Sequence, residues 1–368
     1  MNRDFIFKLI EIAEENNASD IHLKVDNYPL LRIVGEIQPL KEMNILSNDD
    51  LKSMVNDIVP EGKWEELKKK GHADFAIEAP GGKRCRVNVF SQRGSYSISM
   101  RLIPNVIKSF EELHLPDTVR KLAEESRGII LVTGITGSGK STTLAAMIDY
   151  INEKRKAHII TIEDPIEFIH KDKNSIINQR EVGSDVPSFA EGLRSALRQD
   201  PDVILIGEMR DLETIETALI AAETGHLVLS TLHTLDVVET VNRIVSVFPP
   251  YQQDNVRYQL AGVLKGVISQ RLVKTKDGKG RVPAVEILVS TARVRECIID
   301  KTKTTELLDT IEKGRETYGT QSFDQSLLDL IEKGLITYEE ALKHCRNEVD
   351  FSLKYKGLSK ASGEDFWE

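Results

Sequence analysis

The stretch GITGSGKS, residues 134–141, constrains this chain of 368 residues more than any other. It fits the pattern G-x-x-x-x-G-K-[ST] and lies between an apolar run, IILVT, and a helical pattern that begins STTLAAMIDY. Its glycines let the backbone turn so that N–H groups converge on phosphate oxygens, and the N-terminus of the following helix adds partial positive charge. The alternative is a glycine-rich turn that matches the pattern by chance, but here a predicted strand precedes the loop and a predicted helix follows it, as a phosphate-binding loop requires. The sequence therefore predicts a phosphate-binding loop.

Within this loop, the Lys140 ammonium would neutralise the β- and γ-phosphates of a nucleotide, and the Ser141 hydroxyl would ligate Mg²⁺. The residues that we expect to form the nucleotide site are Gly134, Ile135, Thr136, Gly137, Ser138, Gly139, Lys140, Ser141 and Thr142.

Two further apolar runs end in carboxylates. VILI at 203–206 is followed by Gly207 and Glu208, and HIITI at 158–162 is followed by Glu163 and Asp164. Ligands of parallel sheets bind beyond the carboxyl ends of the strands. The acids that end both runs are therefore expected on the edge that carries the phosphate loop. One acid would hold the metal shell through water, and the other would orient or deprotonate the attacking water. The alternative is that these acids cap a helix or pair with a surface lysine.

Two histidines, His226 and His233, stand at opposite ends of the apolar run LVLSTL. This spacing is poor for joint metal binding, and a histidine at a strand end more often only satisfies hydrogen bonds. His233 leaves the carboxyl end, where it would contact the γ-phosphate or the catalytic glutamate. His226 starts the strand at the far edge, so we expect it to contact a neighbouring element or subunit.

The first 104 residues are predicted to form an α+β domain. A helical stripe ends near Asn16, and the segments IHLKV, PLLRIVGEI, HADFAIEA, KRCRVNVFSQ and SYSISMRLIP read as strands. Between them, SNDDLKSMVNDIVP, with Ser47 as its N-cap, and EGKWEELKKKG are expected to be helical. Residues 105–116 are the expected linker.

From residue 117 to 290, unbroken apolar runs alternate with helical patterns, which indicates a parallel sheet covered on both faces. Apolar spacing from Pro250 to Leu272 predicts one longer amphipathic helix. KTKDGKGR is then a polar turn before the strand VPAVEILV. Residues 291–368 read as short helices that end in a frayed tail, SGEDFWE, whose Phe366–Trp367 pair would be exposed.

Composition excludes some classes of protein. A net charge of -9 argues against a chain built mainly to coat nucleic acid. The three cysteines are far apart and form no CxxC pair, which fits a reducing cytoplasm rather than a disulfide framework. The N-terminus lacks a signal-peptide core, and no apolar run approaches the roughly 20 residues of a membrane span. Contact with a membrane is expected only through a partner.

Four motifs then follow in order: GITGSGKSTT at 134–143, TIEDPIEF at 161–168, ALRQDPDVILIGEMRDLET at 196–214 and TGHLVLSTLHT at 224–234. They resemble the Walker A, Asp, Walker B and His boxes of the secretion and type IV pilus ATPases. ASDIHL at 18–23 is similar to the signature of that family's N-terminal domain. Residues 318–342 resemble the C-terminal region of its pilus retraction members.

The resemblance implies an α/β fold with an N-terminal PAS-like α+β domain, a RecA-like P-loop ATPase core and a helical C-terminal extension. It implies a homohexamer that hydrolyses ATP with Mg²⁺ at subunit interfaces. Glu163 would be the catalytic glutamate, Glu208 the Walker B acid, and His226 and His233 the His-box residues, with His233 among the catalytic residues and His226 among those that bind the nucleotide. Arg86 and Arg101, with Arg84 as a further candidate, would reach the ATP of a neighbouring subunit. The alternative is that these strand arginines only pair with surface acids.

Within the family, the lack of a tetracysteine motif and of a longer N-terminal region favours retraction of the pilus. RVRECIID at 293–300 departs from the retraction motif AIRNLIRE at Glu296, Cys297 and Ile299. The expected partners are an inner-membrane platform protein of the PilC type and, indirectly, pilin, with no nucleic acid. The alternatives are an accessory retraction ATPase, a pilus extension or type II secretion ATPase, a nucleic-acid translocase, and a scaffold that binds ATP without hydrolysing it.

Overall fold

The computed structural model describes residues 2–33, 35–104 and 106–362, so the predicted Phe366–Trp367 pair lies outside the described residues. The chain folds into two units, residues 1–106 with 167–169, and residues 107–166 with 170–368. Within the described ranges, no helix is both long enough and apolar enough to cross a bilayer.

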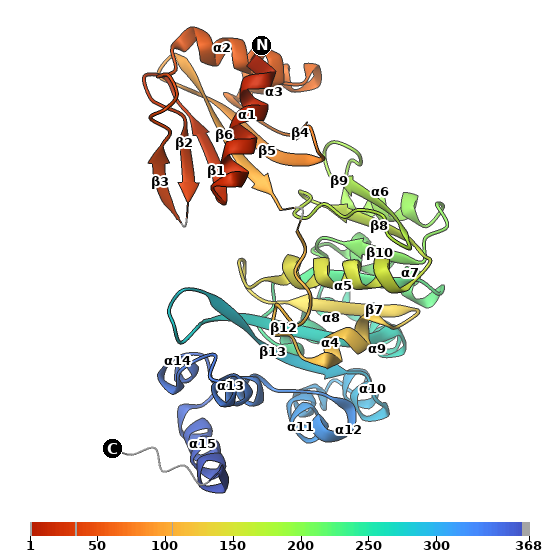
Figure 1. Cartoon of the computed structure of the whole chain (residues 1–368). Coiled ribbons are helices and arrows are strands. Elements are labelled where there is room, and N and C mark those ends of the chain that lie inside the picture. The colour runs from red at the N-terminus through yellow and green to blue at the C-terminus, as the bar shows by residue number, and fades with distance from the viewer. Residues whose placement is uncertain (1, 34, 105, 363–368) are drawn as a thin grey trace. The chain divides into compact units, whose positions relative to one another are not determined.

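The first unit is a six-stranded antiparallel sheet with helices against it (Figure 1). Its strands run in the order β3-β2-β1-β6-β5-β4, and helices α1, α2 and α3 pack against β1, β6 and β4. Residues alternate between buried and exposed along β4 and β5, as expected for a sheet with one covered face. The elements are α1 (Asn2–Glu15), β1 (Ala18–Leu23), β2 (Leu30–Ile33), β3 (Glu36–Pro39), α2 (Asn48–Ile58), α3 (Trp64–Lys70), β4 (His72–Ala79), β5 (Lys83–Gln92) and β6 (Ser95–Ile103).

Local sequence explains where these helices begin and end. The predicted N-cap Ser47 is confirmed, because its hydroxyl accepts from the Asp50 N–H while the Asp50 carboxylate accepts from the Ser47 N–H. Helix α3 stops at Gly71, whose φ of +77° is the left-handed conformation that glycine adopts most easily.

The second unit contains a seven-stranded sheet in the order β13-β12-β7-β11-β10-β8-β9. Its strands are parallel except β13, which pairs antiparallel with β12. The strands are β7 (Gly128–Thr133), β8 (His158–Glu163), β9 (Ile176–Glu181), β10 (Val203–Ile206), β11 (Leu227–Leu232), β12 (Leu264–Lys274) and β13 (Arg281–Val289).

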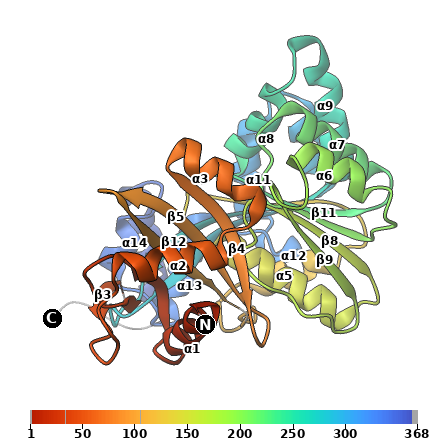
Figure 2. The same ribbon diagram turned by 90° about the horizontal axis from the view of Figure 1, so that it is seen from above.

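Helices cover both faces of this sheet, as the unbroken apolar runs predict (Figure 2). Alternate residues of one strand belong to different cores: Ile129 and Leu131 pack in one cluster, while Ile130 and Val132 pack in the other. The first cluster includes residues of α6 (Phe189–Ala196), α7 (Leu212–Glu223), α8 (Val237–Ser246) and α9 (Pro250–Val263). The second includes residues of α4 (Asp117–Ala123) and α5 (Lys140–Lys154).

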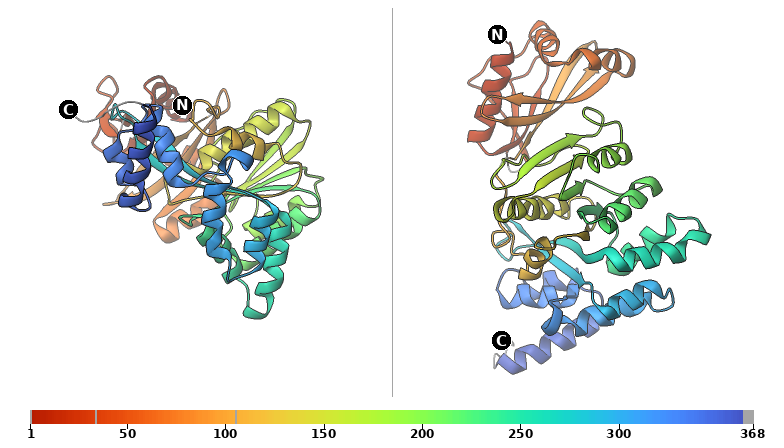
Figure 3. Two further views of the ribbon diagram at one scale, coloured as in Figure 1. Left: turned by 90° about the horizontal axis from the view of Figure 1, so that it is seen from below. Right: turned by 90° about the vertical axis from the view of Figure 1, so that its right-hand side faces the viewer.

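Residues from Ala292 onward form mostly short helices, as predicted, although α15 is as long as α5 (blue in Figure 3). They are α10 (Ala292–Ile299), α11 (Leu307–Lys313), α12 (Arg315–Tyr318), α13 (Phe323–Glu332), α14 (Tyr338–Leu342) and α15 (Glu348–Ser362). Apolar residues of α13, α14 and α15 share a core with Val273, Val282 and Ala284 of the β12–β13 hairpin.

Three predictions of secondary structure are wrong. The helix that starts at Pro250 ends at Val263, and residues up to Lys274 continue as strand β12 beside β7. The segment PLLRIVGEI forms two antiparallel strands, β2 and β3, rather than one. Strand β9 was not predicted, because its sequence, IINQRE, is largely polar and lies at the sheet edge.

Candidate functional site

The predicted phosphate loop connects β7 to α5, as expected. Helix α5 begins at Lys140, and its N-cap Gly139 has a φ of +92°. The Lys140 side chain is buried, and its Nζ donates to the carbonyl oxygens of Gly134 at 2.9 Å and Ile135 at 3.1 Å. Ile135, Thr136 and Gly137 are exposed, whereas Ser138 is buried and its Oγ has no hydrogen-bond partner within the described residues.

Two of the loop glycines lie against strand β12. A Cβ on Gly134 would stand 2.4 Å from the Gln270 carbonyl oxygen and 2.6 Å from Ser138 Oγ. A Cβ on Gly139 would stand 2.7 Å from Gln270 Nε2. Gln270 is itself held by Thr143 of α5, whose hydroxyl donates to its Oε1 at 2.8 Å. The loop is therefore packed against β12, and it presents a buried ammonium, an unpaired hydroxyl and backbone N–H groups, a set of groups that fits a phosphate.

Sheet order and register bring the predicted acids to the same edge as this loop. Thr133, which precedes the loop, is level with Leu232, which precedes His233. Ile206 is level with both Ser230 and Ile162, so Glu163, the last residue of β8, and Glu208, two residues beyond β10, stand at the same end of adjacent parallel strands. With one strand between β7 and β10, the loop and Glu208 leave the sheet about 10 Å apart. The prediction that both acids lie on the edge that carries the loop is confirmed.

Glu163 ends β8 and is held by two neighbours. Its Oε1 accepts from the Thr161 hydroxyl at 2.7 Å and from Gln179 Nε2 of β9 at 3.2 Å. Thr161 is buried and lies on the same face of β8, two residues earlier. Two donors on one oxygen restrict the rotation of the carboxylate.

Glu208 stands in a small polar cluster at the end of β10. Its Oε2 lies 2.8 Å from Arg210 Nη2 and 3.3 Å from His233 Nε2, and those two nitrogens are 3.5 Å apart. The His233 nitrogen can donate to Glu208 or accept from Arg210, and its tautomer decides which. The structure thus brings His233 to Glu208, the expected Walker B acid, rather than to Glu163, the catalytic glutamate that His233 was predicted to contact.

Gly207 sets the spacing of these two strand ends. Its N–H donates to the Ile162 carbonyl oxygen at 2.7 Å, and its own carbonyl oxygen accepts from the Thr231 hydroxyl at 2.6 Å. A Cβ on Gly207 would lie 3.3 Å from the Cα of Glu163 and 3.4 Å from the Phe189 ring. The absence of a side chain allows β8 and β10 to approach closely where their acids leave the sheet.

His226 does not join this site within its own chain, which corrects its assignment as a nucleotide contact. It precedes β11, so the whole strand of about 20 Å separates it from His233. Its Nδ1 donates to the Ala221 carbonyl oxygen at 2.9 Å and lies 3.2 Å from the Thr224 hydroxyl. This is the local hydrogen bonding expected of a histidine at the far edge.

The candidate arginines belong to the first unit and lie on its open face. Arg86 of β5 and Arg101 of β6 are directly opposite each other, and Arg101 is also opposite Asp20 of β1. Arg101 Nε donates to Asp20 Oδ1 at 2.8 Å. Burial acts to raise the pKa of Asp20, but hydrogen bonds from Ser19 and Arg101 outweigh it and lower that pKa below its usual value. Arg84 is half-buried, two residues before Arg86.

Two like charges directly opposite each other destabilise a sheet unless an anion lies between or near them. Asp20 supplies one carboxylate to Arg101, whose side chain remains 70% exposed, and Arg86 is exposed. The pairing of Arg101 with an acid was the alternative interpretation, and the structure shows it for this residue.

Sequence reasoning missed four residues of the site: Thr161, Gln179, Arg210 and Gln270. Thr161 stands within a quoted motif, two residues before Glu163 on β8, so strand alternation was the signal for it. Arg210 follows Glu208 by two residues beyond the end of β10, where no such periodicity applies. Gln179 and Gln270 come from β9 and β12, the two strands that the sequence did not reveal.

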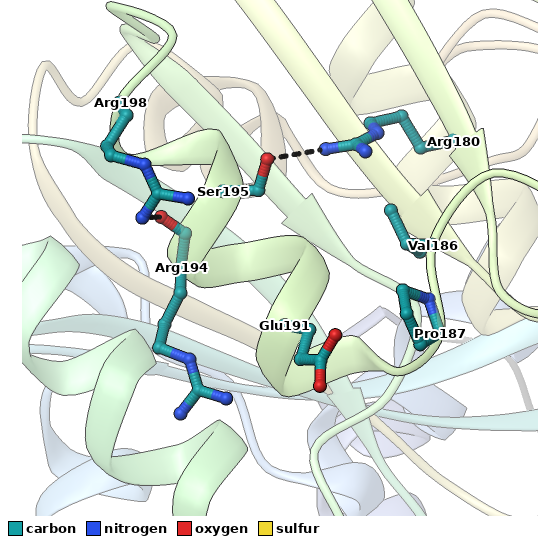
Figure 4. Close-up of a pocket in the computed structure, with 7 residues that line it drawn as sticks. All are labelled: Arg180, Val186, Pro187, Glu191, Arg194, Ser195 and Arg198. Carbon is teal, nitrogen blue, oxygen red and sulfur yellow. Dashed lines mark hydrogen bonds between the residues drawn. The ribbon is translucent and has the colours of Figure 1, made fainter.

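A separate hollow of about 430 Å³ lies beside α6 and includes no residue of the phosphate loop (Figure 4). Arg180 Nη1 donates to Ser195 Oγ at 3.1 Å, and Arg198 Nη1 donates to the Arg194 carbonyl oxygen at 2.9 Å. Arg194 pairs with Glu213. The hollow is basic but holds no predicted site residue.

The chain is similar to known proteins over most of its length. A family model described as Type II/IV secretion system protein matches residues 3–343. The chain is 43% identical over 319 residues to the type IV pilus retraction ATPase PilT of Pseudomonas aeruginosa, covering 87% of this chain and 92% of that one. It is 47% identical over 325 residues to a twitching motility protein of Neisseria gonorrhoeae, covering 88% and 86%.

Among solved structures, the pilus retraction motor PilT with bound ADP superposes with a TM-score of 0.85 at 46% identity, covering 94% of this chain and 98% of that one. The α/β fold expected from the resemblance, with its N-terminal domain and C-terminal helices, is confirmed. On the ordered motifs, the shared fold and the extent of these matches, the chain belongs to the Type II/IV secretion system protein family.

Proposed function

We propose that this chain is the subunit of a hexameric ATPase that powers type IV pilus retraction and thereby twitching motility. One observation carries the proposal: a phosphate loop stands beside two carboxylates at the ends of adjacent strands, in a chain that matches pilus retraction proteins over most of its length. ATP is the substrate, and ADP and phosphate are the products.

In hydrolysis, Lys140 and the loop N–H groups hold the β- and γ-phosphates. Glu163 accepts a proton from the attacking water, and the donors Thr161 and Gln179 keep its carboxylate in one orientation. His233 contacts Glu208 from the end of β11, the strand next to the one that leads into the loop.

Ser141 and Glu208 are the residues that would hold Mg²⁺, the latter through water. Mg²⁺ usually keeps several waters and needs only one or two protein oxygens besides the phosphates, so a hydroxyl and a single carboxylate suffice. When bound, the ion neutralises charge that develops on the transferring phosphoryl group.

Arg86 and Arg101, with Arg84 as a further candidate, act on the ATP of a neighbouring subunit. A guanidinium supplied by another subunit stabilises the phosphoryl charge and makes hydrolysis depend on closure between subunits. His226, at the far edge of the sheet, contacts a neighbouring element or subunit rather than the nucleotide. Successive closures around the ring drive an inner-membrane platform protein of the PilC type, which removes pilin subunits. The ring works in the cytoplasm, at the membrane only through that partner.

The decisive biochemical test is Glu163→Gln. The amide keeps the shape and the contact with Thr161 but cannot accept a proton, so kcat for phosphate release should fall by about 100-fold or more while ATP binding persists. Asp164→Asn, at the adjacent exposed acid, is the matched control and should leave turnover near that of the wild type. Near-normal turnover in Glu163→Gln would contradict the assignment of the base.

Deletion of the gene separates retraction from the rival activities. Loss of a retraction motor leaves abundant surface pili and no twitching, whereas loss of an extension or secretion ATPase leaves no pili or no secretion. Strong stimulation of ATP hydrolysis by single-stranded DNA would instead favour a nucleic-acid translocase.

A further inference from the structure

Glu286 is a fully buried carboxylate of β13 that neither the phosphate loop nor the acids at the strand ends use. Its two oxygens face different parts of the second unit. Oε1 accepts from the Val237 N–H, at the first turn of α8, at 3.0 Å. Oε2 lies 3.4 Å from Nη2 of Arg346, in the segment between α14 and α15.

The α8 contact matters because α8 begins very close to the site. Strand β11 ends at Leu232 and α8 begins at Val237, so only four residues, starting with His233, connect them. Thr234 is buried, and its hydroxyl bonds the Thr240 hydroxyl of α8 at 2.7 Å. A shift of the first turn of α8 therefore moves the connection that carries His233 to Glu208.

The Arg346 contact joins the same point to the C-terminal helices. The Arg346 N–H donates to Asp324 Oδ1 of α13 at 3.0 Å. Nearby, Arg271 of β12 donates to the His344 carbonyl oxygen at 2.8 Å, and its guanidinium lies 3.9 Å from the centre of the Phe323 ring. The segment 344–346 is thus bound to α13 and to both strands of the β12–β13 hairpin.

The charged groups that act on Glu286 come from three neighbouring segments: Asp236 at the N-cap of α8, Arg271 of β12, and Arg346. Burial, with a smaller contribution from Asp236, raises the pKa of Glu286 to about 7, although the Val237 N–H, Arg346 and Arg271 all act to lower it. Asp324 of α13 faces the same group of charges through its contact with Arg346. A protonated carboxyl can still accept from Val237, but only the carboxylate attracts Arg346 strongly.

We propose that Glu286 is a positioning residue for ATP hydrolysis, which fixes the start of α8 and ties the His233 connection to the C-terminal segment through Arg346. This inference rests on the proposed ATPase function. It makes the C-terminal helices, although they contribute no residue to the phosphate loop, a determinant of turnover.

Three variants of the full-length chain test the proposal, with ATP hydrolysis measured at about pH 6 and about pH 8. Glu286→Leu removes both contacts and should lower kcat about tenfold while KM for ATP changes less than about threefold. Glu286→Gln keeps an acceptor for Val237, so it should match the wild type near pH 6 and fall about threefold below it near pH 8, where the wild type is ionised. Arg346→Met should behave as Glu286→Gln does.

Lys343→Met is the matched control, because this exposed lysine precedes the same segment and pairs with Glu340. Combining Glu286→Gln with Arg346→Met should cost no more than either change alone if the two residues act as one unit. Equal kcat in all variants at both pH values would overturn the proposal, even if their melting temperatures fall.

Hydrogen–deuterium exchange of the segment 233–240 gives a readout that does not depend on hydrolysis. Glu286→Leu should speed exchange there, and Glu286→Gln should not. Unchanged exchange in Glu286→Leu would overturn the inference. If the wild-type chain releases no phosphate, the proposed function is overturned instead. The exchange measurement would then test only the contact between Glu286 and the start of α8.

Discussion

In the first sheet, helices cover one face and the other face carries charged side chains, including Arg86 and Arg101. The second sheet is largely apolar on both faces, and the acids and the phosphate loop of its site stand at the strand ends. The open sheet can present an arginine anywhere along a strand, whereas the covered sheet can offer chemistry only where its strands stop.

One buried carboxylate in each sheet illustrates the difference. Asp20 has donors from Ser19 and Arg101, and these outweigh burial and lower its pKa. For Glu286, burial outweighs its donors and raises its pKa to about 7. At the open sheet a charge is readily compensated, while inside the covered sheet the cost of desolvation dominates.

The largest effect is expected at the edge of the covered sheet, in Gly134→Ala. With a φ of +141° and a Cβ that would stand 2.4 Å from the Gln270 carbonyl oxygen, the loop must move away from β12. Affinity for a fluorescent ATP analogue should fall about 100-fold or more, roughly 2.7 kcal/mol. Gly137→Ala is the control, because its φ is also positive but no atom lies within 4 Å. Equal losses in both would show that contact with β12 is unimportant.

An effect of comparable size, which appears only when the pH is varied, concerns Glu286→Gln and the stability of the second unit. Because the pKa of Glu286 is raised in the folded chain, its favourable contribution is complete below the ordinary value of 4.5 and is lost as pH rises to about 7. A glutamine at this position does not titrate, so its contribution to stability does not change with pH. The stability of the variant relative to the wild type should therefore increase by about 3 kcal/mol between acid and alkaline pH. Calorimetric unfolding over that range measures it, and a difference independent of pH would contradict the comparison.

A smaller effect is expected for Thr161→Val, which removes one donor to Glu163 without changing side-chain shape. Loss of a hydrogen bond to a charged group, about 1.4 kcal/mol, should lower kcat about tenfold with little change in KM. Thr161→Ser should restore most of the rate. If kcat does not recover in Thr161→Ser, the loss in Thr161→Val comes from packing rather than from the hydrogen bond.

The smallest effect is expected in the open sheet, for Asp20→Asn. The lowered pKa of Asp20 means that its stabilising contribution is present above its ordinary value of 3.8 and is lost as pH falls through the folded value. Solvent screens its pair with the exposed Arg101, so the loss at neutral pH should be about 1 kcal/mol or less. The free energy of unfolding of Asp20→Asn should therefore fall less than that of the wild type as the pH is lowered through the folded pKa of Asp20. If Asp20→Asn changes the free energy of unfolding by about as much as Glu286→Gln does, the distinction between the two sheets does not hold.

The local parts of the site could be predicted well from the sequence. The phosphate loop, Glu163, Glu208 and His233 each follow an apolar run, and parallel pairing alone brings such strand ends to one edge.

The start of β12 was harder to predict, because the apolar spacing of Val256, Leu260, Leu264 and Val267 suits a helix as well as a strand. Gly262 and Gly266 flank the change at Leu264, and they were the local signal that the helix ends there. Gln270 was missed together with that strand.

Contacts between distant segments could not be predicted from the sequence. The bond between Asp20 and Arg101 joins residues 81 positions apart, and that between Glu286 and Arg346 joins residues 60 apart. Each depends on the register of a whole sheet or on the packing of a helical segment, and no local pattern encodes either.

Gly207 has a consequence for how the rate of such a motor is set. A methyl group at this position would press on the backbone that bears Glu163, so that a neighbour would have to give way by a few tenths of an ångström. Productive alignment of reacting groups tolerates displacements of only about 0.5 Å. A single added carbon would therefore act as a spacer and slow the catalytic cycle while leaving every reacting group chemically intact.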